Sequence, residues 1–370
     1  MSTFESRVRL EIDPAKIVGN FREIRRRVNP CRVMPVLKAN AYGLGGREIA
    51  RHLCEAGADA FGAAEINEAL ELTGFGIPVQ ILGNLLPDEV APAVEAGLWC
   101  PVGDFAAAKR ISDEAVRQKR TAELQIAVDS GMGRLGFVAA RAADEIRRAG
   151  ELPNVRIRGI YSHFSSAFER CNPYNERQLA AFRKLLAELA DIAFEDVHMA
   201  ASDALNNIPE SLRAPFNLAR TGINLYGFYD TCVDRSMMLS PVLSLKTRLA
   251  AVRMLDAGSS IGYGRMHTLK KPTRIGTIAA GYADGLPLAL SNRGYVLLRG
   301  VLCPVLGRVS MDYTTISLEN VPDAEVGDEV VCIGSQGDQT ITLDEWAQLK
   351  GTHVYDLLCS FGTRVRRVYL

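Results

Sequence analysis

Residues 32–57 read RVMPVLKANAYGLGGREIARHLCEAG and contain one complete strand-and-helix unit. The run RVMPVL is short and apolar, which predicts a buried strand. The segment GREIARHLCEAG has its apolar residues at helical spacing, so a helix is expected there. Lys38 stands where the strand opens into the loop. A buried ammonium group is costly unless it is paired. This lysine is therefore expected to function through the chemistry of its amine nitrogen and not through its charge.

The same alternation continues to about residue 228, with helical stretches such as residues 105–119 and 175–192 between short apolar runs. The candidate strands are RVMPVL (32–37), ADAFGAA (58–64), VQILG (79–83), LWCPVG (98–103), LQIAVD (124–129), VRIRGIYSHF (155–164), VHMAAS (197–202) and FNLARTGINLYG (216–227). Eight such units predict an α/β fold of the (β/α)8 TIM-barrel type. The main rival is an open doubly wound sheet, whose G-x-G-x-x-G signature follows none of the early strands.

The pattern changes after about residue 235, where strand-like runs follow one another with glycine-rich turns between them. They are LSLKTRLAAVRML (243–255), TRIGTIAAG (273–281), YVLLRGVLCPVLGRV (295–309), DYTTISL (312–318) and DEVVCIG (328–334). Only TLDEWAQLKG (342–351) has a helical pattern in this part. We therefore expect a barrel over residues 14–232 that carries Lys38, and a mostly β C-terminal domain over residues 233–370, to which strand 7–13 belongs.

Composition limits the classes of function. The 370 residues are 48% hydrophobic and 23% charged, and 43 basic residues balance 43 acidic ones, so neither nucleic acid nor a membrane surface is an expected partner. The start of the chain has no apolar signal region, and no run approaches the length of a bilayer span. The eight cysteines are scattered without a C-x-x-C pair, so no metal site is expected and a cytoplasmic location fits best.

In a (β/α)8 barrel, functional residues gather at the C-terminal ends of the strands. The residues at these ends that are suited to catalysis or ligand binding are Lys38, Arg134, His163, Ser202, Arg220 and Gly222. Barrel enzymes often bind phosphate in the loops after strands seven and eight, where a serine hydroxyl and a glycine are available here. A lysine amine can bond covalently to the aldehyde of pyridoxal 5'-phosphate, so the combination suggests that cofactor. Taken singly, each residue has an ordinary explanation, such as a rim lysine, a core histidine or a salt-bridged arginine.

Seven motifs carry a resemblance to the alanine racemase family, the barrel-type pyridoxal-phosphate enzymes, over nearly the whole chain. In order they are VLKANAYGLG, DSGMGRLGF, YSHFSSA, RTGINLYG, IGYGR, GYADGLP and GRVSMD. The resemblance implies an isomerase that interconverts L- and D-alanine and so takes part in D-alanine biosynthesis. Its substrate is a small amino acid.

The family pattern also implies a role for individual residues. Lys38 carries the cofactor, and Lys38 and Tyr263 are the two bases on opposite faces of Cα. Further cofactor-binding residues are Tyr42, Arg134, His163, Ser202, Arg220, Gly222 and Ile223. Substrate-binding residues are Arg134, Met311 and Asp312, while His198 and Tyr282 support the site. The family forms a head-to-tail homodimer, so Tyr263, Met311 and Asp312 are expected to serve the partner's barrel.

Three alternatives remain open. They are a racemase of another small amino acid such as serine, a cofactor-carrying barrel protein without turnover, and a related decarboxylase or aldolase. Carrier proteins of this type are short, and the β domain with Tyr263 argues against that class. The motifs IGYGR and GRVSMD fit a racemase better than a decarboxylase.

Three positions depart from the family pattern. Ala127 replaces a lysine that can be carbamylated and brace Arg134, Ala201 replaces an asparagine, and Thr363 replaces a tyrosine near the C-terminus. These changes are expected to alter how the phosphate is bound and how large the substrate pocket is. In place of the missing carbamate, a bound anion such as chloride is expected to brace Arg134.

Overall fold

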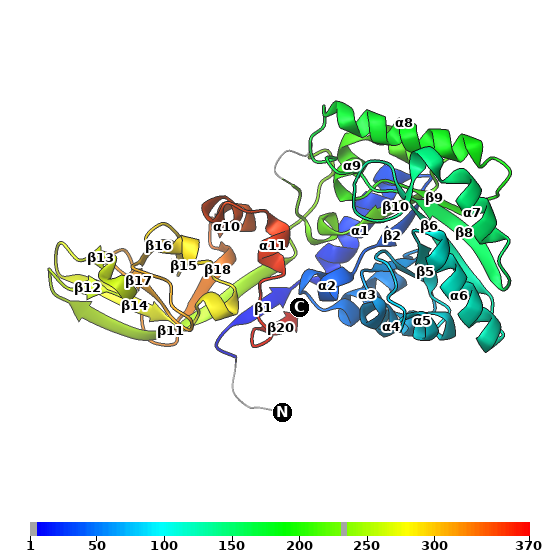
Figure 1. The fold of residues 1–370 in the computed structure, drawn as a ribbon. Helices are drawn as coiled ribbons and strands as arrows, with labels where there is room; N and C mark the ends of the chain where they lie inside the picture. The colour runs from blue at the N-terminus through cyan, green and yellow to red at the C-terminus, as the bar shows by residue number, and fades with distance from the viewer. Residues whose placement is uncertain (1–5, 231–234) are drawn as a thin grey trace. The chain divides into compact units, whose positions relative to one another are not determined.

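The computed structural model describes residues 6–230 and 235–370 (Figure 1). Contacts divide the chain into two compact units. One unit is Ala15–Pro241, and the other combines the segment ending at Pro14 with Val242–Leu370. The boundary expected between residues 232 and 233 lies outside the described residues.

The first unit holds a ring of parallel strands. In order around the ring they are β10 (Leu218–Thr221), β2 (Arg32–Pro35), β3 (Phe61–Ala63), β4 (Val79–Ile81), β5 (Trp99–Val102), β6 (Ala122–Asp129), β8 (Val155–Tyr161) and β9 (Asp196–His198). A bridge between Val36 and Gly62 joins β2 to β3. The Arg220 N–H donates to the Ala200 carbonyl oxygen at 3.1 Å and so links β10 to the end of β9. The predicted (β/α)8 barrel is confirmed, and each expected strand is present.

Helices alternate with these strands. They are α1 (Pro14–Val28), α2 (Lys38–Tyr42), α3 (Gly46–Glu55), α4 (Ile66–Leu72), α5 (Val90–Glu95), α6 (Phe105–Gln118), α7 (Ala143–Gly150), α8 (Pro173–Glu188) and α9 (Ser202–Asn207). Local sequence explains where several begin. Asp104 accepts a hydrogen bond from the Ala107 N–H and caps α6. Asn172 caps α8, and Pro173 occupies its first turn, where a missing N–H costs nothing. The short β7 (Phe137–Val138) pairs with β6.

The interior of the barrel is polar as well as apolar. Gln80, Gln125, Asp196 and His198 are fully buried, and Arg220 is nearly so. Asp196 accepts hydrogen bonds from Gln125 Nε2 at 3.0 Å and from Arg158 Nε at 2.9 Å. Buried polar groups are costly unless they are paired, so these bonds hold Asp196 and its two partners in defined positions.

The second unit is mostly β, as predicted. Its strands are β1 (Arg9–Ile12), β11 (Leu243–Leu255), β12 (Ser260–Ile261), β13 (His267–Thr268), β14 (Thr273–Ile278), β15 (Tyr295–Leu298), β16 (Val301–Leu306), β17 (Thr314–Ser317), β18 (Glu329–Gln336), β19 (Gln339–Ile341) and β20 (Arg366–Tyr369). The order β18-β15-β16-β17-β14-β11 returns to β18 through a further pairing, so these strands form a closed sheet. The β1 strand pairs antiparallel with β11 and parallel with β20, so the blue and red ends of the chain lie side by side in Figure 1.

The expectation of a single helix in this region was wrong. The predicted helix is present as α10 (Leu343–Lys350), with Thr342 and Glu345 forming a capping box. A second helix, α11 (Val354–Leu358), follows it and buries its apolar face through Val354, Leu357 and Leu358. Five residues are too few to display a helical period in the sequence, which is why this element was missed.

Within the described parts of the chain, no helix combines the length and apolar character that crossing a membrane requires.

Candidate active site

Lys38 begins α2, directly after the first strand of the barrel. The four residues that follow it, Ala39 to Tyr42, all have φ between 52° and 57°. This left-handed conformation is unfavourable for residues other than glycine, so the surroundings must enforce it. Glu68 accepts hydrogen bonds from the Ala39 N–H at 2.5 Å and the Ala64 N–H at 3.0 Å. Asn40 accepts from the Gly46 N–H at 2.7 Å, and together these bonds fix the loop that carries Lys38.

Tyr42 lies against the loop after β10. A Cβ atom at Gly222 would stand 2.2 Å from the Tyr42 hydroxyl oxygen, so only glycine fits there. The Gly222 N–H donates to Ser202 Oγ at 2.9 Å. Ile223 follows Gly222 and begins a 3-10 turn, Ile223–Tyr226. The structure thus brings Tyr42, Ser202, Gly222 and Ile223 together, where backbone N–H groups and hydroxyls suit a phosphate.

Arg220 is 3% exposed and makes four hydrogen bonds from its guanidinium. It donates to the carbonyl oxygens of Ser162 (2.8 Å) and Met199 (3.0 Å). The other two bonds reach Nδ1 of His198 at 2.6 Å and Nδ1 of His163 at 3.1 Å. No carboxylate among the described residues pairs with it. Burial lowers the pKa of Arg220 to about 10, which still leaves it charged at neutral pH.

Both histidines are held neutral by these contacts. Arginine has only N–H donors, so each Nδ1 accepts and each ring carries its proton on Nε2. Burial, followed by the charges of Arg220, Arg134 and Lys38, lowers the pKa of His163 to about 3. Burial and the Arg220 charge also lower the pKa of His198 well below its usual value. Tyr161 stacks on the His198 ring with centroids 5.2 Å apart, which fixes the plane of that ring.

Arg134 is exposed and lies in the turn after β6. The nearby carboxylate of Asp129 does not hold it. Asp129 instead accepts hydrogen bonds from the N–H groups of Gly131 (2.8 Å) and Gly133 (3.1 Å) and so shapes the turn. No hydrogen bond or ion pair joins Arg134 to another of the described residues. Ala127 is buried on β6 and offers no charge. The guanidinium is therefore available for an anionic ligand, a carboxylate included.

The remaining predicted residues are Tyr263, Tyr282, Met311 and Asp312; they lie in the second unit, and all but the half-buried Asp312 are exposed. Tyr263 is 72%, Met311 51% and Tyr282 44% exposed. Tyr263 sits between Gly262 and Gly264, both with positive φ, so the turn projects the phenol into solvent. The Tyr282 N–H donates to the Ser310 carbonyl oxygen at 3.0 Å, which places Tyr282 beside the Met311–Asp312 segment.

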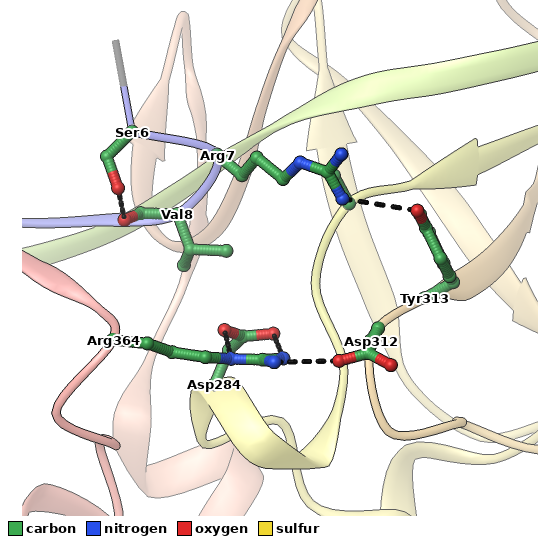
Figure 2. Close-up of a pocket in the computed structure, with 8 residues that line it drawn as sticks. Ser6, Arg7, Val8, Asp284, Asp312, Tyr313 and Arg364 are labelled. Atoms are coloured by element: carbon green, nitrogen blue, oxygen red, sulfur yellow. Dashed lines mark hydrogen bonds and ion pairs between the residues drawn. The ribbon is translucent and has the colours of Figure 1, made fainter. Parts of the chain in front are cut away.

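The sequence did not indicate the roles of several residues of the site. Glu68 holds the Lys38 loop but looks like an ordinary helix residue, and Tyr161 belongs to the motif YSHFSSA, which does not reveal its stacking on His198. The roles of Arg364 and of Asp284, which lies in the motif GYADGLP, were also missed. These two residues form an ion pair at 2.7 Å beside Asp312, in a pocket of about 390 Å³ (Figure 2).

Two family models together match most of the chain. "Alanine racemase, N-terminal domain" matches residues 12–230, and "Alanine racemase, C-terminal domain" matches residues 242–369. The chain belongs to the alanine racemase family. This membership confirms the resemblance inferred from the seven sequence motifs.

Similar proteins match along almost their full lengths. "Alanine racemase 2" of Caldanaerobacter subterraneus is 37% identical over 369 residues, which cover 98% of this chain and 94% of that one. The alanine racemase structure from Streptomyces lavendulae has a TM-score of 0.92 at 34% identity and covers 99% of this chain and 98% of that one. The Bartonella henselae alanine racemase structure, described with covalently bound pyridoxal phosphate, has a TM-score of 0.89 at 28% identity and covers 99% of this chain and all of that one.

Proposed function

We propose that this protein is a pyridoxal-phosphate-dependent racemase that interconverts L- and D-alanine by a two-base mechanism. Membership of the family over both domains gives the class of reaction. Within that class, the observation that carries the proposal is the environment of Arg220. It is a buried guanidinium held by two carbonyl oxygens and two neutral histidines, without a carboxylate among the described residues. Because arginine has only N–H donors, such a group would donate to an acceptor atom of a bound ligand.

The residues of the barrel fit pyridoxal phosphate. Lys38 supplies the amine that attaches it, and Ser202, Gly222, Ile223 and Tyr42 supply hydroxyl and N–H groups for its phosphate. With the cofactor bound, Arg220, His163 and Arg134 would hold its ring, Arg220 as a donor to the ring nitrogen and Arg134 as a donor to the phenolic oxygen. When bound, the cofactor withdraws electrons from Cα of an attached amino acid and so makes the Cα proton acidic.

Racemisation requires that a proton leave one face of Cα and return to the other. The Lys38 amine would hold or move the proton on one face. Tyr263 does so on the opposite face, and its phenol needs nearby positive charge to act as a base near neutral pH. Arg134 binds the substrate carboxylate and sets which face each base meets. Arg220 would keep its proton, because burial lowers its pKa only to about 10.

The two groups of residues meet when two chains pair head to tail. Tyr263, Met311 and Asp312 then enter the partner's barrel, while Tyr282 and His198 support the two sides. The high exposure of Tyr263 and Met311 in a single chain supports this arrangement, because exposed aromatic and methionine side chains are typical of interfaces. The protein acts in the cytoplasm, where it supplies D-alanine for biosynthesis.

A direct test follows the optical rotation of L-alanine in the presence of purified protein, together with the absorbance of bound cofactor. Loss of rotation with stoichiometric cofactor supports the proposal. A carrier protein would bind the cofactor without changing the rotation, although the family membership does not favour this alternative. A parallel screen of the common L-amino acids identifies the preferred substrate, and faster turnover of serine would replace alanine in the proposal.

A further inference from the structure

Three segments that are far apart in the sequence meet beside Asp312. They are the turn Gly281–Gly285, the segment Ser310–Asp312 and the segment Phe361–Arg364. A Cβ atom at Gly281 would stand 2.2 Å from the Ser310 carbonyl oxygen, and one at Gly362 would stand 2.5 Å from the Ala283 carbonyl oxygen. Both glycines are therefore required for this close approach.

Arg364 joins the other two segments through its guanidinium. Its Nε and Nη2 donate to the carboxylate of Asp284 at 2.7 and 2.8 Å. Its Nη1 donates to Asp312 Oδ1 at 2.7 Å, and Nη2 also reaches the Met311 carbonyl oxygen at 3.3 Å. Figure 2 shows the guanidinium lying between the two carboxylates. The planar fork of arginine can make these bonds at once, which a lysine ammonium cannot.

Asp284 anchors the arrangement. It is 3% exposed, and its Oδ2 also accepts from the Gly281 N–H at 2.9 Å, which closes the turn that carries Tyr282. The backbone supports the same contact, because the Ala283 N–H donates to the Met311 carbonyl oxygen at 3.1 Å. Arg364 thus connects a fixed, buried carboxylate to a segment whose side chains are exposed.

We propose that Arg364 is a positioning residue that holds Met311 and Asp312 in place through its bonds to Asp284 and Asp312. The inference rests on the proposed function, in which Met311 and Asp312 approach the substrate. Arg364 itself is not required to touch the substrate. We call the bonds of Arg364 to Asp284 and Asp312 the clamp. A small displacement of a substrate-positioning group can cost a large factor in rate or affinity, so loss of the clamp should weaken substrate binding.

The chain offers a matched control in the same unit. Arg299 also bridges two carboxylates, those of Asp323 at 2.5 Å and Asp328 at 2.9 Å. Its side chain is 40% exposed, against 47% for Arg364. Arg299 lies at the turn between β15 and β16, and its ion pairs join it to Asp323 and Asp328, not to the Met311–Asp312 segment. Arg299→Met therefore removes a comparable surface network without releasing the proposed clamp.

The experiment compares Arg364→Met, Arg364→Lys and Arg299→Met in the cofactor-loaded protein. Steady-state kinetics should show KM for L-alanine raised about tenfold in Arg364→Met, while kcat changes by less than about threefold. Arg364→Lys should fall between this variant and the wild type. A purely structural role would reduce the active fraction, which lowers kcat and leaves KM unchanged.

Hydrogen exchange provides a readout that does not depend on turnover. The amides of Tyr282 and Ala283 should exchange about tenfold faster in Arg364→Met, and at the wild-type rate in Arg299→Met. Unchanged exchange and unchanged KM in both Arg364 variants would overturn the inference, as would an equal rise of KM in Arg299→Met. If Arg364→Met does not fold, Arg364→Lys decides by the same two measurements. Wild-type protein without alanine turnover would instead refute the proposed function, and the exchange data would still test the clamp.

Discussion

The two groups of predicted residues differ in how completely the single chain fixes them. In the barrel, Arg220 and His198 are almost fully buried and bonded to each other. In the second unit, Tyr263 and Met311 are more than half exposed. Arg220 and His198 are thus preorganised before any partner or ligand binds, whereas the side chains of Tyr263 and Met311 are exposed and available for a contact. From this difference we expect changes in the second group to reduce turnover while cofactor binding is retained, and changes in the barrel group to affect both.

Removing Lys38 should have the largest effect. In the proposed mechanism, Lys38→Ala removes both the covalent attachment of the cofactor and one of the two bases, so turnover should fall by about 10⁴-fold or more. Borohydride treatment followed by mass spectrometry should find no cofactor on the variant. Lys109→Ala is the control, because Lys109 pairs only with Asp113 on the surface of the same unit. A cofactor adduct on another lysine of Lys38→Ala would remove Lys38 from its role.

Replacing Tyr263 should separate turnover from cofactor binding. Tyr263→Phe deletes only the phenolic oxygen, so the cofactor should bind normally while activity falls about 10²- to 10⁴-fold. Exchange of the Cα proton with solvent should slow for one alanine enantiomer much more than for the other, because only one face loses its base. Tyr295→Phe is the control, since Tyr295 is a similarly exposed tyrosine of the same unit, 48% accessible. Equal exchange from both enantiomers would exclude Tyr263 as a base.

Mixing two inactive variants tests whether the two groups come from different chains. If sites are shared, a dimer of Lys38→Ala with Tyr263→Phe has one site with both residues intact. After random subunit exchange of equal amounts, activity should recover to about a quarter of the wild-type value. Differently tagged chains allow the mixed dimer to be isolated and its formation verified. Inactive mixed dimers would mean that each chain completes its own site.

The fold could be predicted because its signals are local and repeated. The β11 strand has the predicted bounds, 243–255, since alternation over 13 residues defines both its ends and its buried face. The barrel followed from the number of short apolar runs and not from any one of them. The missed α11 shows the limit of this method, because its five residues are shorter than two helical turns.

The details of the site could be predicted only in part. Family motifs pointed to Lys38 and Arg220. The left-handed conformation of Ala39–Tyr42 could not be predicted, because this segment contains no glycine, the residue that usually indicates positive φ. It depends on the Glu68 carboxylate, which comes from a different helix. The proposed role of Arg364 likewise depends on its bonds to Asp284 and Asp312, which are 80 and 52 residues away in the sequence. Contacts of this kind arise from tertiary structure, and no single segment of the sequence encodes them.

The smallest predicted effect concerns the pH dependence of stability in the barrel group. Burial and neighbouring cations lower the pKa of His163 from 6.5 to about 3 in the folded chain. Between these two pH values the unfolded chain therefore binds a proton that the folded chain does not. The free energy of unfolding should rise with pH across this window, by at most about 1.4 kcal/mol per pH unit from this residue, and its contribution should be complete above pH 6.5.

Carboxylates also titrate in this range, so the test is a difference between variants. Urea unfolding of the cofactor-free protein from pH 4 to pH 7 should give a shallower dependence for His163→Gln than for the wild type, because glutamine can accept the Arg220 bond but cannot titrate. His353→Gln is the control, since His353 is exposed and loses little water on folding. Parallel curves for the wild type and His163→Gln would show that His163 does not stay neutral in the folded barrel. The contrast between a preorganised barrel group and an exposed second group would then have to rest on Arg220 and His198 alone.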